Sequence, residues 1–347
     1  MYNGKKNSLV IGIAILILLV TVLSGCGNKS GQTTAADGTK LEKIIVAQPI
    51  TGESWLPVYL AQQLGFFREE GLDVNFTTFE GGPLVIASLI AGDSQFALTG
   101  YDQVLKTNEK GKPTKMIVAT TDKFPWTFIV AKDVKSAEDL KGKKVSAGKE
   151  GSSPRSFVRT VIKYAGLNPD KDVQYVFIPP AGDMGALEKG EVAGAEVEGS
   201  QRVKLLQRGY KPFVDLNDPE EHRKVLGTDK YHLHVVQVTD DFIKSHPDTV
   251  QKFVNAVVRA IAWENSHSSD EITKAIAPLF PNSDLEIEKS VIDGTMQSQT
   301  KDGYFSQTAH DAAVRLALDV GMITREATKE SAVDETFLKK AHEEYGK

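Results

Sequence analysis

Two kinds of short apolar segment alternate along residues 43–238. One kind alternates apolar with polar residues or is rich in β-branched residues, as strands are. The predicted strands are 43–48, 72–79, 95–99, 116–120, 127–131, 143–147, 173–178, 194–197 and 235–238. The other kind has helical spacing, and these segments are 55–64, 81–91, one starting at 100, 136–139, 153–164, 184–189 and 200–207. This alternation predicts an α/β fold with largely parallel sheets.

The pattern changes after residue 238. From Thr239 to the end, apolar residues recur almost throughout at helical spacing. A long helix is predicted to begin at His246-Pro247, because the apolar residues from Val250 to Ile261 fall on one face. Further helices are predicted at 269–279, 284–297, 307–318 and 334–345. The C-terminal part is therefore expected to be mostly helical.

The N-terminal segment has the pattern of an export signal. Lys5 and Lys6 precede an almost wholly apolar run of 15 residues at 9–23 (LVIGIAILILLVTVL). That run is shorter than the roughly 20 residues that span a bilayer as a helix. A basic head, a short apolar core and a small-residue end predict a secretory signal. The alternative is a signal anchor that stays in the membrane.

The only cysteine of the chain directly follows this segment. The stretch Leu23-Ser24-Gly25-Cys26 resembles the lipobox of bacterial lipoproteins. The resemblance implies a signal peptide at 1–25 and lipid attachment at Cys26, so that two acyl chains hold the protein at the membrane. Residues 26–40, small and polar, are predicted to be a flexible tether. We therefore expect a protein anchored to the cell membrane, facing the outside or the periplasm.

The charge and length of the remaining chain limit its function. The net charge is −5, and without Lys5 and Lys6 it is −7. A mixed, moderately acidic surface argues against nucleic acid as a partner. About 300 residues remain after the tether, which is enough for two lobes.

Three stretches resemble the solute-binding proteins of the nitrate, sulfonate, taurine and bicarbonate type. They are PVYLA at 57–61, GFFREEGLDV at 65–74 and SAEDLKGKKV at 136–145. The resemblance implies the type II periplasmic-binding-protein fold, a bound small molecule, an ABC permease as membrane partner, and a monomer. Lobe one is then expected at 43–130 plus 236–347 and lobe two at 131–235. Two crossover strands, near 128–131 and 232–236, are expected to form a hinge.

The ligand is expected past the carboxyl ends of the strands, where helices begin and free N–H groups favour anions. Trp55 is a candidate to stack on it, with a place over the core as the equal alternative. Gly81 and Gly82 permit close approach of backbone to a ligand, or they only make a turn. At the next strand end, Gly100 is a candidate amide donor and Tyr101 a hydroxyl donor.

The loop that opens the helix at 153–164 is a candidate oxyanion site in lobe two. Ser152, Ser153 and the following amides suit a sulfonate or carboxylate, and Arg155 is able to add a bidentate contact. In the alternative, Ser153 only caps the helix, with Pro154 as the first helical residue, and Arg155 is solvated.

Two acidic residues and a tryptophan complete the candidate site. Glu196 and Glu198 alternate on one face at a strand end, where a carboxylate suits a cationic or amine-bearing ligand. Two solvated carboxylates are the alternative. Trp126, just before the hinge, is a candidate wall of the cleft, with core packing as its alternative.

These residues predict binding and delivery rather than catalysis. No Ser–His–Asp signature, nucleophilic cysteine or phosphate-cradling loop is recognisable, and no cofactor is implied. His232 and His234 lack a third ligand at metal-site spacing, so no metal site is predicted. The expected ligand is a sulfonate-, taurine- or nitrate-like anion. A related branch of the family that the sequence resembles comprises proteins of thiamine-pyrimidine metabolism, some of them enzymes. The alternatives are therefore a receptor for a thiamine-type aminopyrimidine with Glu198 as its partner, an enzyme of that branch, and an interaction lipoprotein with a degenerate cleft.

Overall fold

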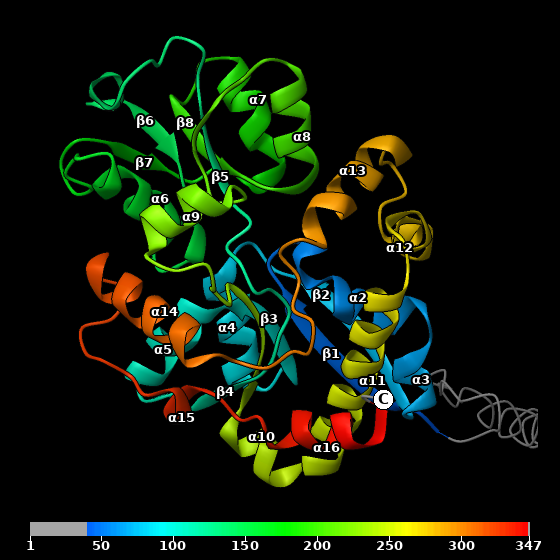
Figure 1. Ribbon diagram of the computed structural model, residues 1–347. Helices are drawn as coiled ribbons and strands as arrows, with labels where there is room; N and C mark the ends of the chain where they lie inside the picture. Colours follow the sequence, from blue (N-terminus) through cyan, green and yellow to red (C-terminus); the bar gives the residue numbers. More distant parts are fainter. Residues whose placement is uncertain (1–39, 346–347) are drawn as a thin grey trace, which may run out of the picture. The chain divides into compact units, whose positions relative to one another are not determined.

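The computed structural model describes residues 40–345 (Figure 1). The predicted signal peptide and the lipidation site at Cys26 lie outside these residues and stay predictions. Residues 42–345 belong to one compact unit, which contains two separate β-sheets. No helix of the described residues is long and apolar enough to cross a membrane.

Sheet one has five strands in the order β2-β1-β3-β10-β4. Its strands are β1 (Glu42–Gln48), β2 (Leu72–Thr78), β3 (Phe96–Gly100), β4 (Thr114–Ala119) and β10 (His234–Thr239). Strand β10 runs antiparallel to both of its neighbours, while β1 is parallel to β2 and β3. We call this sheet and the helices packed on it lobe one.

Sheet two also has five strands, in the order β7-β6-β8-β5-β9. Its strands are β5 (Thr127–Val130), β6 (Lys144–Ser146), β7 (Gln174–Val176), β8 (Gly194–Val197) and β9 (Pro212–Asp215). Here β5 is the antiparallel strand, paired with β8 and β9. We call this sheet and its helices lobe two. The sequence pattern missed β9, a four-residue strand at the sheet edge that starts with a proline, where a missing N–H is tolerated.

The chain passes twice between the two sheets. Residues 120–126 lead from β4 to β5, and residues 216–233 lead from β9 back to β10. Each crossing therefore leads into the strand that is antiparallel to the other strands of its sheet, β5 or β10. The predicted hinge strands correspond to β5 and β10, and hinge movement itself stays a prediction.

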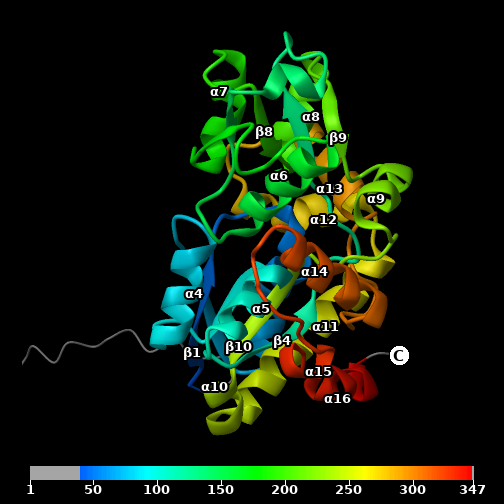
Figure 2. The ribbon, with the colours of Figure 1, turned by 90° about the vertical axis from the view of Figure 1, so that its left-hand side faces the viewer.

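Helices cover the faces of both sheets (Figures 1 and 2). Those of lobe one include η1 (Glu53–Trp55), α2 (Leu56–Gln63), α3 (Phe66–Glu69), α4 (Gly82–Ala91), α5 (Tyr101–Glu109), α10 (Asp240–Ser245), α11 (Pro247–Ser266) and α16 (Thr336–Tyr345). Those of lobe two are η2 (Ala137–Leu140), α6 (Ser153–Tyr164), η3 (Pro180–Gly182), α7 (Asp183–Glu188), α8 (Gly199–Gln207) and α9 (Pro219–Leu226). The start of α6 corrects one prediction: its N-cap is Ser152, and Ser153 is already helical.

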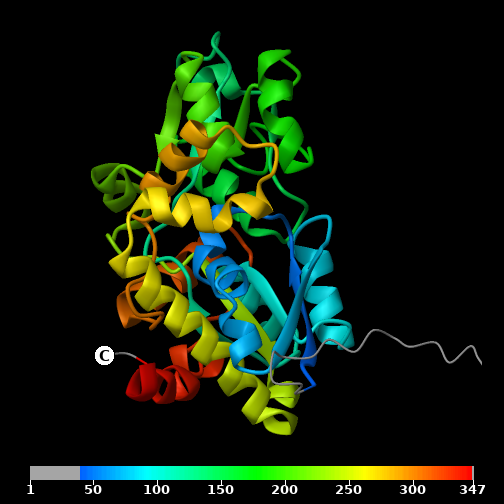
Figure 3. The same ribbon diagram turned by 90° about the vertical axis from the view of Figure 1, so that its right-hand side faces the viewer.

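Five further helices of the described chain follow in the C-terminal part, and two of them contact both lobes. The five are α12 (Ser269–Ile276), η4 (Ala277–Leu279), α13 (Leu285–Thr295), α14 (Gln307–Asp319) and α15 (Lys329–Ala332). Helix α13, orange in Figure 3, contacts α8 of lobe two as well as η1. Helix α14 contacts both α5 and α6 (Figure 2).

Two hydrophobic cores hold this arrangement. In lobe one the buried ring of Phe96 stacks on Phe253 of α11, with ring centroids 4.0 Å apart. A second core runs from one lobe into the other and includes Phe124, Phe157 and Tyr231. Since this core contains residues of both crossings, apolar burial stabilises the junction between the lobes.

Candidate functional site

A cavity of about 590 Å³ lies between the two lobes. Lobe one contributes the loops that follow β1 and β2, and the end of β3. Lobe two contributes the loops that follow β6, β7 and β8. All six strands point their carboxyl ends at the cavity, which is where α/β sheets bind ligands.

Eight of the ten residues predicted to bind a ligand line this cavity. They are Trp55, Gly81, Gly82, Gly100, Trp126, Ser152, Ser153 and Glu198. The structure therefore brings together, around one cavity, eight residues that were selected because they lie near strand ends. Whether they bind a ligand stays a prediction.

Tyr101 and Arg155 are not among the lining residues. Tyr101 is fully buried, and its hydroxyl lies 2.7 Å from Nδ1 of His310 on α14. The guanidinium of Arg155 packs over the ring of Tyr175, and its Nε donates to the carbonyl of Gly148 at 3.1 Å. Both side chains therefore bind within the protein and are not placed to contact a ligand in this cavity.

The two serines of the predicted oxyanion loop also have partners within the protein. Ser152 Oγ donates to the carbonyl of Lys149 at 2.7 Å. Ser153 Oγ donates to the carboxylate of Asp102, a buried residue of α5 in lobe one. The second bond joins the lobes, so the hydroxyl predicted to bind an anion instead ties α6 to α5.

Gly100 allows this close approach of the lobes, and Gly82 allows a similar contact within lobe one. A Cβ at Gly100 would lie 2.0 Å from Ser153 Oγ, across the gap between the lobes. A Cβ at Gly82 would lie 1.9 Å from Nε2 of Gln103. Both glycines therefore leave the space that neighbouring side chains fill, rather than serving only as turn residues.

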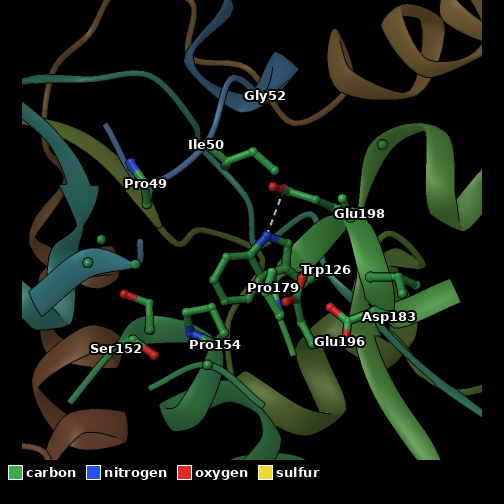
Figure 4. A pocket seen from close by; sticks show the side chains of 18 of the residues that line it. Pro49, Ile50, Gly52, Trp126, Ser152, Pro154, Pro179, Asp183, Glu196 and Glu198 are labelled. Carbon is green, nitrogen blue, oxygen red and sulfur yellow. Dashed lines mark hydrogen bonds between the residues drawn. The ribbon is translucent and has the colours of Figure 1, made fainter. Parts of the chain in front are cut away.

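Trp126 and Glu198 are paired at one wall of the cavity (Figure 4). The indole Nε1 of Trp126 donates to Glu198 Oε2 at 2.7 Å, and Ser54 Oγ donates to the same oxygen at 2.9 Å. Burial raises the pKa of Glu198, and these two donors partly offset that rise. Ser54 belongs to lobe one, so Glu198 also joins the lobes.

The lining residues that were not predicted to bind a ligand include Gln103, Lys149, Asp183 and His234. His234, the first residue of β10, lies edge-on to the rings of Trp55 and Trp126 at 4.6 and 5.7 Å. Burial lowers its pKa to about 3, so the imidazole is neutral near pH 7. Asp183 begins α7, and the strand-end rule applied to the loop after β7 would have found it.

Most of the ionisable side chains that line the cavity are carboxylic acids. Burial raises the pKa of Asp183 to about 7. Burial and then the negative charges of Glu198 and Asp183 raise the pKa of Glu196 well above its usual range. Lys149 is paired with Glu80 at 2.8 Å, from lobe two to lobe one. Within residues 40–345, no three His, Cys, Asp or Glu side chains are grouped as a metal site.

Two lobes with a cavity at the strand ends define a protein of the periplasmic-binding-protein fold, as predicted, and solved structures of that fold match this chain. A protein from Bordetella bronchiseptica RB50 matches with a TM-score of 0.79, at 23% identity over 88% of this chain and 98% of that one. The chain belongs to the NMT1/THI5 like family, whose model matches residues 53–269.

Relatives in sequence are of two kinds. A proposed aliphatic sulfonates-binding protein of Bacillus subtilis (strain 168) is 24% identical over 96% of this chain and 97% of its own length. A 4-amino-5-hydroxymethyl-2-methylpyrimidine phosphate synthase of Candida albicans (strain WO-1) is 26% identical over 61% of this chain and 64% of its own. The resemblance noted in the sequence is therefore confirmed, on both its binding-protein side and its pyrimidine side.

Proposed function

We propose that this protein is the extracytoplasmic solute-binding component of an ABC importer. It holds a small molecule between its lobes and delivers it to a membrane permease. The observation that carries the proposal is the cavity of about 590 Å³, because loops of both lobes line it at their strand ends. A ligand that contacts both lobes favours the closed arrangement, and a permease is then able to distinguish loaded from empty protein.

Export and lipid anchoring belong to this proposal. The signal-like segment at 9–23 and Cys26 after it support a protein held at the membrane by two acyl chains. Binding proteins among the relatives support the same placement. We propose that the described body is tethered outside the cytoplasm and acts as a monomer.

Binding without chemistry fits the cavity better than catalysis. The hydroxyls of Ser152 and Ser153 donate to a carbonyl and to Asp102, and neither contacts a histidine. His234 is flanked by two tryptophans and its pKa is far below 7. A nucleophile activated by a neighbouring base needs a contact of hydrogen-bond length between the two groups. The synthase among the relatives makes turnover the alternative outcome of the test.

The ligand predicted from the sequence was a sulfonate-, taurine- or nitrate-like anion. That choice retains the support of the sulfonate-binding relative and of the α6 N-terminus at the cavity. The aminopyrimidine alternative has the support of Glu198 and Trp126 in the cavity wall. The acidic lining weighs against a simple anion, since like charges repel at short range.

Thermal unfolding of the purified full chain in detergent tests the proposed function. The panel contains alkyl sulfonates, taurine, nitrate, the aminopyrimidine, and small amines of similar size. A ligand at about 100 times its Kd adds roughly 2.7 kcal/mol to the stability and raises Tm by several degrees. A compound that binds and is recovered unchanged supports a receptor. One that is converted supports an enzyme, and no shift with any compound contradicts both.

The contact between Gly100 of lobe one and Ser153 of lobe two predicts how closely the lobes approach each other when a ligand is bound. Gly100→Ala should weaken the binding of any ligand found in this way by about tenfold, since overpacking costs roughly 1–3 kcal/mol and here acts on the closed form. The added Cβ meets Ser153 Oγ of the other lobe. Isothermal titration measures the loss, and Ser153→Gly in the same chain should restore most of the affinity. Unchanged affinity in Gly100→Ala would mean that the lobes do not approach here when ligand is bound.

A further inference from the structure

We propose that the ligand is an organic cation, a protonated amine or amidine on an apolar or aromatic body, and that Asp183 and Glu196 hold its charged nitrogen. This inference rests on the proposed solute-binding function and names the substrate class of the same cavity. No role was predicted for Asp183 from the sequence. Glu196 and Glu198 were predicted together as carboxylates for a cationic ligand, with Glu198 named as the ligand contact, whereas the structure favours Glu196 with Asp183.

The geometry separates Glu196 from Glu198. Glu198 already accepts from Trp126 and Ser54. Within the described part of the chain, the carboxyl of Glu196 makes no hydrogen bond, although it lines the same cavity. Figure 4 shows it beside the carboxyl of Asp183, close enough for the charge of Asp183 to act on it. Two neighbouring carboxyls without a donor between them are suited to a ligand that brings N–H groups.

Asp183 has a smaller deficit, because Ser146 donates a hydrogen bond to its carboxyl group and only one of its two oxygens lacks a partner within the described residues. Its side chain is 6% exposed, and among residues 40–345 its Oδ1 has no hydrogen-bond partner. Buried polar atoms in native proteins are normally paired, and an unpaired one costs about 1–3 kcal/mol. A ligand ammonium or amidinium satisfies this oxygen and Glu196 together.

The charges of the lining lead to the same ligand. The described lining residues include five acids: Glu53, Glu80, Asp183, Glu196 and Glu198. Their lone cation is Lys149, and its ammonium is paired with Glu80. The raised pKa values of Asp183 and Glu196 indicate that these carboxyls hold their protons more firmly than usual, which limits the repulsion. A ligand cation replaces those protons, whereas an anion adds a further negative charge.

The opposite wall gives an independent indication of a ligand. Trp55 Nε1, Gln103 Nε2 and His234 Nδ1 belong to lobe one, and within the described residues none has a hydrogen-bond partner. All three side chains line the cavity and are at least 95% buried, with exposures of 3%, 5% and 2%. Trp55 and Gln103 are donors here, so this wall suits an acceptor on the ligand. A ligand with a cationic end and an acceptor end thus contacts both lobes.

The body of the ligand lies between these ends. Ile50, Trp126 and Phe177 contribute apolar surface to the lining. Apolar and aromatic walls with a few placed polar groups are typical of small-molecule sites. The indole of Trp126 is fixed by its bond to Glu198, so its ring offers a preorganised face to an aromatic body or an adjacent cation.

Isothermal titration of the full chain in detergent with charge-matched probes tests the inference. The probes are benzylamine and benzamidine, with benzyl alcohol as neutral match and benzenesulfonate as the anionic match. We expect the two cations to bind and the alcohol and benzenesulfonate to bind at least tenfold more weakly. The variant Asp183→Asn/Glu196→Gln should lose at least tenfold in affinity for the cations. Glu191→Gln, an exposed acid near the start of β8, should bind them as the parent does.

The variant is expected to fold, because asparagine and glutamine match the shape of the carboxyls that they replace and bring no buried charge. Its unfolding curve is measured beside that of the parent. Stronger binding of benzenesulfonate or benzyl alcohol than of the cations, or unchanged cation affinity in a folded double variant, would overturn the inference and leave the solute-binding function intact. If no probe of any charge binds, the inference and the proposed function fail together.

Discussion

Replacing Gly194 by alanine should lower the free energy of unfolding by about 3 kcal/mol, since overpacking a core costs roughly 1–3 kcal/mol and more where nothing gives way. Gly194 begins β8, the middle strand of sheet two. A Cβ there would lie 2.4 Å from Cζ and 2.8 Å from Cε1 of Phe128. The ring of Phe128 is fully buried, so it cannot rotate into solvent to make room.

Urea unfolding of the full chain measures this effect, and Gly185→Ala is its matched control. Gly185 lies in α7 of the same lobe, and a Cβ there meets nothing within 4 Å. Alanine at Gly185 should leave the stability unchanged or raise it by up to about 1 kcal/mol. Shortening the ring in Gly194→Ala/Phe128→Leu should recover part of the loss. A loss below about 0.5 kcal/mol in Gly194→Ala would mean that Phe128 is not held against this strand.

The same glycine links the core to the candidate site. Strand β8 carries Glu196 two residues after Gly194 and ends just before Glu198. A shift of β8 away from Phe128 would move both carboxyls, so Gly194→Ala should also weaken ligand binding. The small residue at the start of the strand thus lets a packed core fix the position of charged groups at its end.

The fold was largely predictable because its signals are local. The run at 43–48 corresponds to β1, and the glycines and proline at 81–83 lie at the start of α4. The elements of lobe two that were missed include β9 and α9, for different reasons. Strand β9 is short, starts with proline and lies at an edge, so its pattern is weak. Helix α9 had a readable signal in Asp218-Pro219, a capping aspartate followed by proline at the first helical position.

The site was predictable to the level of loops but not of side-chain directions. The strand-end rule fixes which loops meet, because parallel strands bring their carboxyl ends to one edge. It does not fix where a side chain points. The hydroxyl of Tyr101 pairs with His310, which lies 209 residues further along the chain. Within the described residues, Asp183 Oδ1 lacks a hydrogen-bond partner because the side chain is buried by the tertiary fold, and burial of that kind is not predictable from the local sequence.

Replacing Glu264 by glutamine should make the protein more stable at alkaline pH, by about 2–4 kcal/mol relative to the parent at about pH 9. Glu264 lies on α11 and is 2% exposed. Its Oε2 has no hydrogen-bond partner among residues 40–345. Burial raises its pKa to about 8, and the charge of Lys301 offsets only part of that rise.

The sign of this effect follows from proton binding. In the unfolded chain the carboxyl loses its proton near its ordinary pKa of 4.5, whereas in the folded protein it keeps the proton to about pH 8. Between these values the folded state binds more protons, so the contribution of Glu264 to stability is full below about pH 4.5 and is lost as the pH rises to about 8. Glutamine does not titrate. The difference between variant and parent should therefore grow in favour of the variant from about pH 5 to about pH 9.

Urea unfolding at about pH 5, 7 and 9 measures this trend, with Glu326→Gln as the control at an exposed glutamate. The control should differ from the parent by less than about 0.5 kcal/mol at each pH. A constant offset for Glu264→Gln across the range would mean that Glu264 ionises as freely in the folded state as in the unfolded one. Because Glu264 does not line the cavity, a positive result would also show that the body tolerates buried, protonated carboxyls, which is the state inferred for Asp183 and Glu196 before a cation binds.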